Sequence, residues 1–456
     1  MACAPWCSTL HLLTCNPFGS RQMYKSSVEE PLNLLKALLD QAILRALPEH
    51  NLAPHLPKPP KGRTLVLGAG KAAASMAQAL EKHWPISAPL SGLVVTRYGH
   101  VPKLVGAIAP RVEIMQAAHP VPDGQSVLAS RKMLELTHGL TQDDLVIALI
   151  SGGGSSLLTL PALGMSLEQK QALNRSLLQC GASISEINCV RKHLSAIKGG
   201  RLAKACAPAQ LLTLCISDVP GDDPATIASG PTVADETTCE QALAVIEKYQ
   251  LQLPSSLLQA LRTHELETPK ASQLSAFAQE VRVIATPQDA LESAAAYAQS
   301  KGLRSYILSD EIEGESKDVA LVHAALAKAC AKDLGPFKRP CVLLSGGETT
   351  VTLGAHSTGG RGGRAGEFCL SLAKSLGSNP NIWALAADTD GIDGVEDNAG
   401  AFVDPLTLQR AESLGLKVDE FLSRHDAYGF FEAVGGLVTT GPTYTNVNDF
   451  RAILIL

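Results

Sequence analysis

Aromatic side chains are scarce in this chain of 456 residues: Phe, Trp and Tyr together account for 4% of it, whereas Ala, Leu and Gly are abundant. Small and aliphatic residues suit helices that pack closely on a parallel sheet. Strong charge of one sign is also lacking, because the net charge of −5 is spread along the chain without a basic stripe. Since a nucleic-acid groove needs such a stripe, we expect no nucleic-acid partner.

Paired cysteines and long apolar runs are lacking as well. The eleven cysteines include no CxxC pair, and several lie inside apolar runs, which indicates reduced thiols in a cytoplasmic protein rather than a disulfide or zinc framework. No run has the length of a transmembrane helix, so we expect no membrane partner. Because the apolar segment 9–15 lacks the basic leader of a signal peptide, we interpret residues 1–22 as a disordered or non-native extension.

The chain is longer than one hydrophobic core usually supports, so two domains of roughly 200 residues each are expected. Residues 265–278 are polar and carry little periodicity, which makes them the best boundary. We therefore expect a first domain over 23–270 and a second domain over 278–456. Helical spacing of apolar residues predicts helices over 29–47, 72–83, 126–136, 166–180, 239–249 and 318–334.

Short apolar runs that end abruptly in glycine or polar residues recur along the chain. The clearest is the run 146–150, which leads into Ser151, Gly152, Gly153, Gly154 and Ser155. Consecutive glycines let the backbone approach a ligand, and their N–H groups can form a nest for phosphate or carboxylate oxygens. Four further runs end alike, at 68–71, 217–218, 345–348 and 388–391. Five such strand ends predict open α/β sheets with a ligand-binding edge at the carboxyl ends of the strands.

Residues 68–73 fit the loose dinucleotide fingerprint GxGxxA. The next strand ends in Thr96 and Arg97 and offers no acid for a ribose, which counts against NAD. Lys71 lies at a predicted helix N-terminus, where a lysine is unfavourable unless an anion compensates its charge. It therefore indicates an anionic ligand or partner, and the alternative is an exposed lysine that caps a turn.

Acidic side chains follow two of the predicted strands. Asp218 could act as a general base toward a substrate hydroxyl or could cap the following turn. The acids Asp388, Asp390, Asp393 and Asp397 do not match a calcium loop; a magnesium ion held by one or two carboxylates together with phosphate oxygens suits them better. Solvated turn aspartates are the alternative, and this alternative is weakest for Asp390.

Basic side chains are concentrated in two other segments. Arg361 and Arg364 are set among four glycines, a pattern that lets a guanidinium reach a phosphate through close approach of the backbone. The unusually polar stretch 185–202 contains Arg191 and Lys198 and ends in a pair of glycines. Both segments are candidates for binding anions.

Several motifs, taken together and in order, give the chain a resemblance to a known family. They are GKAA at 70–73, HPVPD at 119–123, SGGGS at 151–155, the stretch 188–200, SDV at 217–219, SGP at 229–231, SGGE at 345–348, TDG at 389–391 and TNVND at 445–449. From about Pro31 to its end the sequence resembles the ATP-dependent glycerate kinases with a carboxy-terminal MOFRL domain, the glycerate 2-kinases. The resemblance implies a Rossmann-like doubly wound first domain, a second α/β domain of the MOFRL type, and an active site in the cleft between them.

The same resemblance implies phosphoryl transfer from ATP to the 2-hydroxyl of D-glycerate, giving 2-phosphoglycerate and ADP, with Mg2+ as the expected metal. The catalytic lysine, aspartate and arginine of the family fall on Lys71, Asp218 and Arg364. Asp390 is expected to hold the metal. Substrate or phosphate binding is expected of the loop 151–155 and of Arg191, Lys198, Glu348 and Asn446.

Two positions depart from the pattern of the family. After Arg364 the family continues Asn-Gln-Glu, whereas Ala365 and Gly366 precede Glu367 here. The two missing amide side chains put affinity or substrate geometry near Arg364 in question. Tyr444 stands where a glycine is more usual, and we expect it to crowd the active site.

Bacterial relatives have often been named hydroxypyruvate reductases, so an NAD(P)H-dependent reductase is the second hypothesis. The absent ribose-binding acid and the abundance of phosphate-type loops favour the kinase. A third reading, a module that only binds sugar acids, leaves Asp390 and Arg364 without a purpose. The sequence leaves open the oligomeric state, including a homodimer, the exact acceptor acid, the nucleotide preference and the domain that holds ATP.

Overall fold

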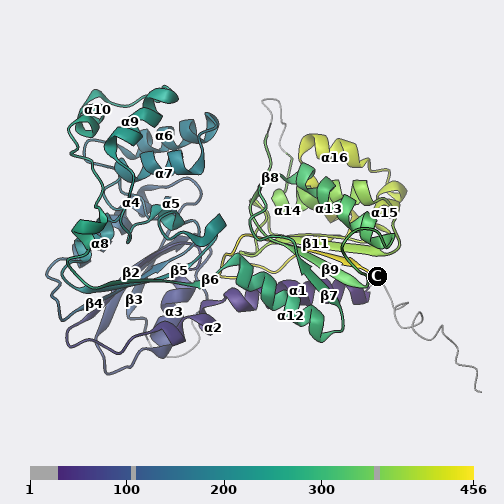
Figure 1. Cartoon of the computed structure of the whole chain (residues 1–456), viewed down its shortest axis with the longest axis horizontal. Helices are drawn as coiled ribbons and strands as arrows, with labels where there is room; N and C mark the ends of the chain where they lie inside the picture. Colours follow the sequence, from purple (N-terminus) through teal and green to yellow (C-terminus); the bar gives the residue numbers. More distant parts are fainter. Residues whose placement is uncertain (1–28, 104–108, 354–359) are drawn as a thin grey trace, which may run out of the picture.

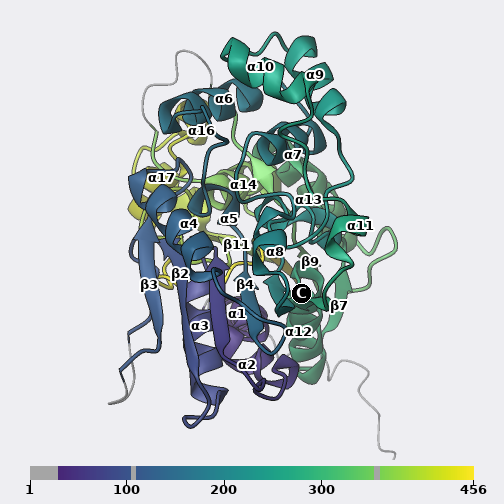
Figure 2. The ribbon, with the colours of Figure 1, turned by 90° about the vertical axis from the view of Figure 1, so that its left-hand side faces the viewer.

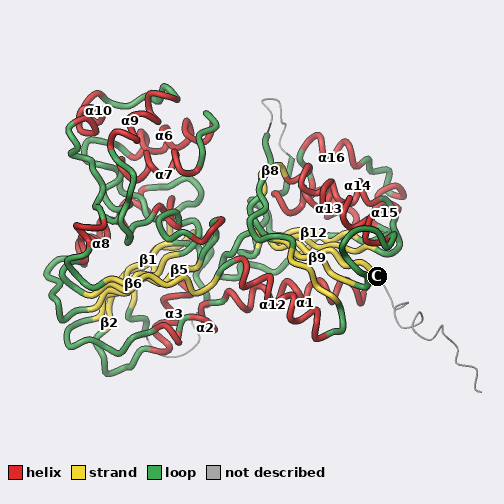
Figure 3. Tube along the Cα trace, viewed as in Figure 1, coloured by secondary structure: helices red, strands yellow, loops and turns green. Residues whose placement is uncertain are grey.

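The computed structural model describes residues 29–103, 109–353 and 360–456, so the expected extension 1–22 lies outside the described residues. Two six-stranded sheets form the centres of two domains. Figure 1 shows them side by side, each with helices on both faces, and in Figure 3 the strands form a layer between helices in each domain. The predicted α/β class with two domains is confirmed.

The first sheet is entirely parallel and has the strand order β3-β2-β1-β4-β5-β6, which is the order of the Rossmann fold. The order reverses between β1 and β4, the point at which α/β sheets of this kind bind ligands. The strands are β1 (Thr64–Ala69), β2 (Leu90–Arg97), β3 (Val112–Ala117), β4 (Leu145–Ile150), β5 (Gln210–Ile216) and β6 (Gln279–Ala285).

Apolar runs such as Leu145–Ile150 are continuous because both faces of the first sheet are covered. Val66 and Ile147 pack on one face in a cluster with Met76 of α3 (Ala73–His83). Leu67 and Ala148 pack on the other face with Met133 of α4 (Gly124–Leu136). Further short helices of this domain are α2 (Pro48–Asn51), α5 (Gly154–Leu157), α8 (Arg201–Cys206) and α11 (Ala271–Leu274).

A separate helical unit lies at one end of the first domain, at the top of Figure 2. It consists of α6 (Leu167–Gln179), α7 (Ile184–His193), α9 (Cys239–Lys248) and α10 (Ser255–Arg262), which share an apolar cluster of their own. Capping boxes at Ser166, Ser183 and Thr238 begin three of these helices. The polar stretch 185–202 is therefore not one element, since it covers most of α7 and the beginning of α8.

The second sheet is mixed and has the order β13-β12-β11-β14-β9-β7. Because β14 is antiparallel to both β9 and β11, the carboxyl ends of β9 and β11 and the amino end of β14 meet at one edge. The strands are β7 (Arg304–Ile307), β9 (Cys341–Ser345), β11 (Ile382–Asp388), β12 (Gly400–Val403), β13 (Leu437–Val438) and β14 (Asp449–Ile455), and β8 (Gly314–Glu315) pairs with β10 (Thr349–Thr350).

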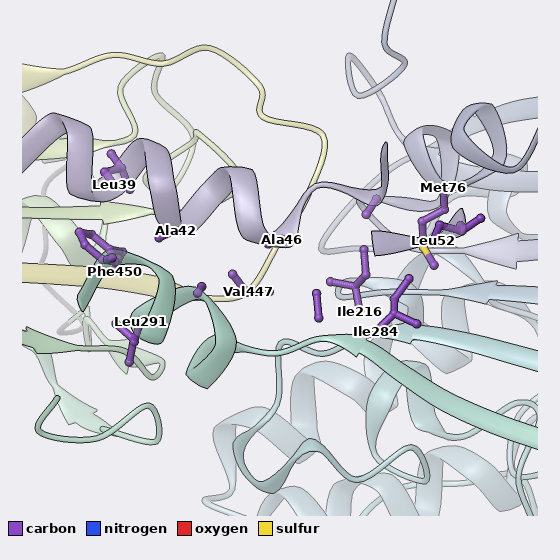
Figure 4. Packing of buried hydrophobic residues seen from close by; sticks show 14 of the residues in the cluster. Leu39, Ala42, Ala46, Leu52, Met76, Ile216, Ile284, Leu291, Val447 and Phe450 are labelled. Atoms are coloured by element: carbon purple, nitrogen blue, oxygen red, sulfur yellow. The ribbon is translucent and has the colours of Figure 1, made fainter. Parts of the chain in front are cut away.

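One face of the second sheet is covered by α13 (Ser316–Ala331), α14 (Arg364–Leu376), α15 (Thr407–Ser413), α16 (Val418–Arg424) and α17 (Ala427–Val434). The other face is covered by α12 (Pro287–Ser300) and by the first helix of the chain, α1 (Glu29–Ala46). Figure 4 shows Leu39 and Ala42 of α1 near Leu291 of α12 and Phe450 of β14. No described helix combines the length and the apolar character needed to cross a bilayer.

The course of the chain between the sheets differs from the expected division at 270–278. Strand β6 follows the expected boundary in sequence but pairs with β5 in the first sheet. Helix α1 lies within the expected first domain but packs on the second sheet. The apolar alternation at 281–285 identifies a strand without specifying its sheet. By sheet membership, the segment 48–285 is an insertion between α1 and α12.

Candidate active site

The ends of β1, β4 and β5 bring the glycine loop, Lys71 and Asp218 together. The Lys71 amide donates to the carbonyl oxygen of Gly152 at 2.8 Å. A Cβ atom added to Gly152 would lie 1.9 Å from Asp218 Oδ2, and one added to Gly153 would lie 3.2 Å from Lys71 Cγ. The predicted proximity of the 151–155 loop to the Lys71 turn is confirmed, and any larger residue at 152 would displace Asp218.

The glycine loop itself is held from two sides. Ser151 Oγ accepts a hydrogen bond from the Ala72 amide at 3.0 Å, and the hydroxyls of Ser155 and Ser229 are 2.9 Å apart. Gly153 has a φ of 76°, a conformation that glycine adopts without strain. Within the described part of the chain the amides of Gly152 and Gly153 donate to no acceptor, so both N–H groups are available to a ligand.

The second domain completes this arrangement across the domain junction. Lys71 Nζ donates to Asp390 Oδ2 at 2.6 Å, and Asn446 Nδ2 donates to Asp218 Oδ2 at 3.0 Å. Burial opposes the charge on Lys71, but the carboxylates of Asp390 and Asp388 raise its pKa above the ordinary value. Lys71 is therefore an ammonium ion, compensated by an anion as its position at the start of a helix requires.

Arg364 is the first residue of α14, and three carboxylates hold its guanidinium. Nε donates to Asp449 at 2.6 Å, Nη1 to Glu348 at 2.6 Å and Nη2 to Asp388 at 3.0 Å. Burial opposes its charge, whereas Asp449, Asp388 and Glu348 raise the pKa of Arg364 well above the ordinary value. Three of its five N–H donors are thus used, and two remain for a ligand.

The pKa of Asp218 is raised to about 7, first because burial desolvates its carboxylate and then because the negative charge of Glu348 repels it. A carboxylate with a pKa close to neutrality is suited to accept a proton from a hydroxyl. Asn446 engages Oδ2 and Asn448 Nδ2 donates to the backbone carbonyl of Asp218. The side chain is thereby fixed with its other oxygen available.

Asp390 is buried and its two carboxylate oxygens already have partners. Oδ2 accepts from Lys71, and Oδ1 accepts from the Ile392 amide at 2.8 Å. Asp388, Glu348 and Asp449 lie around it in one network of ion pairs, so the donor set consists of oxygen atoms, as Mg2+ prefers. Among the described residues these oxygens face Lys71 and Arg364 rather than one common point.

Three charged residues of the segments 361–364 and 388–397 bond to other parts of the protein. Asp393 accepts hydrogen bonds from the amides of Ala365 at 3.0 Å and Gly366 at 2.8 Å, and so caps the N-terminus of α14. Asp397 is exposed and accepts from the Tyr428 hydroxyl at 2.8 Å. Arg361 pairs with Glu396 at 3.1 Å and lies over the Tyr428 ring. Phosphate binding by Arg361 stays a prediction, because its guanidinium already pairs with Glu396.

Arg191 and Lys198 lie behind the glycine loop rather than beside Asp218. Lys198 is buried, and its Nζ donates to the backbone carbonyl of Ser155 at 2.7 Å. Arg191 Nε donates to Asn174 Oδ1 on α6 at 3.3 Å. Lys198 thus supports the loop from within, and a direct role of either residue in binding phosphate stays a prediction.

Sequence reasoning missed several residues at this junction. Arg97 is the last residue of β2, and His119 follows β3 much as Lys71 follows β1, so the rule of polar strand ends could have found them. Asp449 and Asn448 lie at the amino end of β14. A rule based on carboxyl ends cannot find them, because β14 runs antiparallel to its neighbours β9 and β11.

The two departures from the family pattern have local structural counterparts. A Cβ atom at Gly366 would lie 3.1 Å from the Cβ of Ala427 on α17, so the absence of a side chain at 366 permits this close helix contact. Tyr444 has a φ of 62°, in the left-handed region that favours glycine. Its backbone carbonyl accepts a hydrogen bond from Ser75 of the first domain.

Similarity to known proteins agrees with this geometry. Residues 34–262 match the family described as Domain of unknown function (DUF4147), and residues 341–449 match the MOFRL family. The chain is 39% identical to the glycerate 2-kinase of Pyrococcus horikoshii over 87% of this chain and 88% of that protein. It is 54% identical, over 92% of this chain and 94% of the other, to an Agrobacterium vitis protein provisionally named hydroxypyruvate reductase.

The crystal structure of a glycerate kinase from Thermotoga maritima is also similar, with a TM-score of 0.82 and 37% identity, covering 94% of this chain and all of that one (100%). The similarity thus extends over both domains and includes the junction at which Lys71, Asp218 and Arg364 lie. The chain therefore belongs to the glycerate kinase family, in which a DUF4147 domain is followed by a MOFRL domain.

Proposed function

We propose that this protein is a glycerate 2-kinase, which transfers the γ-phosphoryl group of ATP to the 2-hydroxyl of D-glycerate and releases 2-phosphoglycerate and ADP. The observation that carries the proposal is the position of Asp218. Its carboxylate, with a pKa of about 7, lies against the glycine loop and is oriented by Asn446 from the second domain. Lys71 and Arg364 place two cations at the same junction.

In the proposed reaction Asp218 takes the proton of the 2-hydroxyl while the hydroxyl oxygen bonds to the γ-phosphorus and the bond to ADP breaks. The Gly152 amide and Lys71 offset negative charge on the phosphoryl oxygens, since positioning and charge stabilisation dominate this kind of transfer. Arg364 fixes Glu348, Asp388 and Asp449 and keeps two N–H donors for phosphate.

The chemistry of the donor set suits Mg2+, because Asp390, Asp388 and Glu348 supply carboxylate oxygens, which in this structure bond to Lys71 and Arg364. When bound, the ion would neutralise charge on the phosphate oxygens. Asp390 is the residue we assign to it, directly or through water, with Glu348 as its helper. We place the protein in the cytoplasm, and the eight cysteines that the structure describes, all free thiols, agree with a reducing compartment.

The reductase remains the second candidate, because the name of the Agrobacterium vitis relative points to it. The carboxyl end of β2 carries Arg97 instead of the acid that binds an NAD ribose, which disfavours NADH. One paired assay separates the two functions: D-glycerate with ATP and Mg2+, and hydroxypyruvate with NADH or NADPH. Formation of ADP only in the presence of D-glycerate supports the kinase, whereas oxidation of either nicotinamide by hydroxypyruvate without kinase turnover would refute it.

A further inference from the structure

The guanidinium of Arg97 has unusually few partners for a charged group in a domain junction. Its side chain is 20% exposed, and its one ion pair is the 3.9 Å approach of Nη1 to Asp390 Oδ2. That oxygen is already bonded to Lys71 at 2.6 Å. Across the described ranges Arg97 donates no hydrogen bond to protein, so its five N–H donors are available to a ligand.

Two histidines, His100 and His119, lie near the Arg97 guanidinium. Burial and then the charges of Arg97 and Lys71 lower the pKa of His100 to about 4. Burial and then the charges of Lys71 and Arg97 lower the pKa of His119 to about 3. His100 is 1% exposed, and neither of its ring nitrogens has a partner in the described structure. Both rings are therefore neutral at pH 7 and add hydrogen-bonding groups without adding charge.

The glycine loop borders this group directly. A Cβ atom at Gly153 would lie 2.9 Å from His119 Nε2, and the Gly153 amide has no acceptor among the described residues. The loops that carry the arginine and the histidine are fixed to each other, since the Tyr98 amide donates to the Ala117 carbonyl at 3.2 Å and the Gly99 amide donates to Gln116 Oε1 at 2.9 Å. The group is a preformed site for an anion.

We propose that Arg97, His119 and the Gly153 amide bind the carboxylate of the acceptor acid, a refinement that rests on the proposed kinase function. Lys71 is neutralised by Asp390, so the net charge of this site is that of Arg97 alone. One positive charge with neutral donors matches a carboxylate better than the several charges of a triphosphate.

The spacing of the loop also matches a 2-hydroxy acid. Asp218 borders Gly152, whereas His119 borders the next residue, Gly153, and consecutive Cα atoms are about 3.8 Å apart. In a 2-hydroxy acid the hydroxyl oxygen is bonded to the carbon next to the carboxylate carbon. Binding of the carboxylate at Gly153 therefore brings the 2-hydroxyl within reach of Asp218. The arginine site would thus set the specificity for an acid.

The test compares Arg97→Gln with the wild type, using D-glycerate and its uncharged amide, glyceramide, as acceptors. Loss of a charge-assisted bond to a carboxylate should raise the KM for D-glycerate roughly 10- to 100-fold, with the KM for ATP within about twofold, and should remove most of the preference for D-glycerate over glyceramide. Arg97→Lys should recover part of the affinity. Arg131→Gln is the matched control, because Arg131 is exposed on α4.

A rise in the KM for ATP alone would assign the site to a nucleotide phosphate and overturn the proposal, as would unchanged constants in folded Arg97→Gln. Calorimetric titration with D-glycerate in the absence of nucleotide separates this proposal from the kinase assignment. If the wild type binds D-glycerate and Arg97→Gln binds it roughly 10- to 100-fold more weakly, the carboxylate site stands even where no ATP is consumed. Equal affinities, or no binding by the wild type, would reject it.

Discussion

Lys71, Asp218 and Arg364 each lie where a strand or a glycine segment ends, and none is part of an apolar cluster. We therefore predict that Lys71→Ala, Asp218→Asn and Arg364→Ala each lower kcat by about 10²- to 10³-fold, the usual effect of losing a preorganised polar partner. Circular dichroism would confirm that the variants fold. Asp397→Ala is the control, and near-normal turnover of a folded variant would remove that residue from the mechanism.

The raised pKa of Asp218 predicts two dependences on pH. Since the carboxylate must accept a proton, kcat/KM should rise with pH and level off above about 7. Between pH 4 and 7 the folded protein holds this proton more tightly than the unfolded chain, so the residue's contribution to stability falls as pH rises through that window.

In Asp218→Asn the fall of kcat/KM below about pH 7 should therefore be absent. The variant should also be more thermally stable than the wild type at pH 8, but not at pH 4. Rate profiles and thermal melts at both pH values measure this. A wild-type limb near pH 4 would contradict the role of burial and of Glu348.

Asp390→Asn should weaken the dependence on magnesium, because a carboxylate oxygen of the donor set is lost. We expect the Mg2+ concentration for half-maximal turnover to rise by about 10-fold or more, within the range found when metal-site partners are removed. Asp397→Asn should leave the titration unchanged. Identical titrations for wild type and Asp390→Asn would favour a purely structural role as the partner of Lys71.

At the residue scale, the sequence predicted which positions meet, because polar residues at the carboxyl ends of parallel strands share one edge. It did not predict their pairing. Arg364 has the charge of a phosphate ligand but is bonded to three carboxylates, and the spacing of its partners along the chain contains no sign of this. The same sequence pattern left Arg361 and Arg364 equivalent, although only Arg364 lies at the domain junction.

Among the elements, α14 positions Arg364, and a side chain from another segment caps the N-terminus of this helix. Asp393 bonds the first free amides of the helix. Asp393→Ala should cost about 1–2 kcal/mol of stability, the usual range for a lost cap. It should also lower turnover, because the helix turn that carries Arg364 is no longer capped. Urea unfolding and kcat measure the two effects.

Asp397→Ala, four residues away on the exposed part of the same loop, should change neither quantity by much. Equal effects of Asp393→Ala and Asp397→Ala would contradict the assignment of the cap. The helix α14 was not predicted from the sequence, since its first turn contains Gly366 and follows a glycine-rich segment. By contrast, the regular apolar spacing in α1 and α6 predicted both helices nearly to their ends.

For the whole molecule, the packing of α1 on the second sheet predicts a remote effect on stability. Leu38 is fully buried there, so Leu38→Ala should cost about 2–5 kcal/mol. A chain that starts at Met23 and carries Trp84→Phe retains Trp383 of β11 as its single tryptophan, which makes the second domain the fluorescent reporter. In this background, Leu38→Ala should move the unfolding transition of Trp383 to a lower urea concentration.

The control for this prediction is Leu44→Ala, because Leu44 lies on the same helix and is 42% exposed. An unshifted Trp383 transition in Leu38→Ala would contradict the placement of α1 in the second domain. The sequence predicted α1 as a helix and 281–285 as a strand, but an apolar face does not specify its partner. The association of α1 with the second sheet depends on contacts across more than 200 residues, and that of β6 with the first depends on pairing with β5, such as Leu211 with Gln279. Local patterns supply neither.

The insertion of the first domain between α1 and α12 also has a consequence for synthesis on the ribosome. α1 emerges first, but its partner α12 begins about 240 residues later, from Ala46 to Pro287; at about 5–20 residues per second this is a delay of roughly 12–50 s. All six strands of the inserted domain are complete within that interval. The apolar side of α1 therefore waits for its partners until the whole inserted domain has been synthesised.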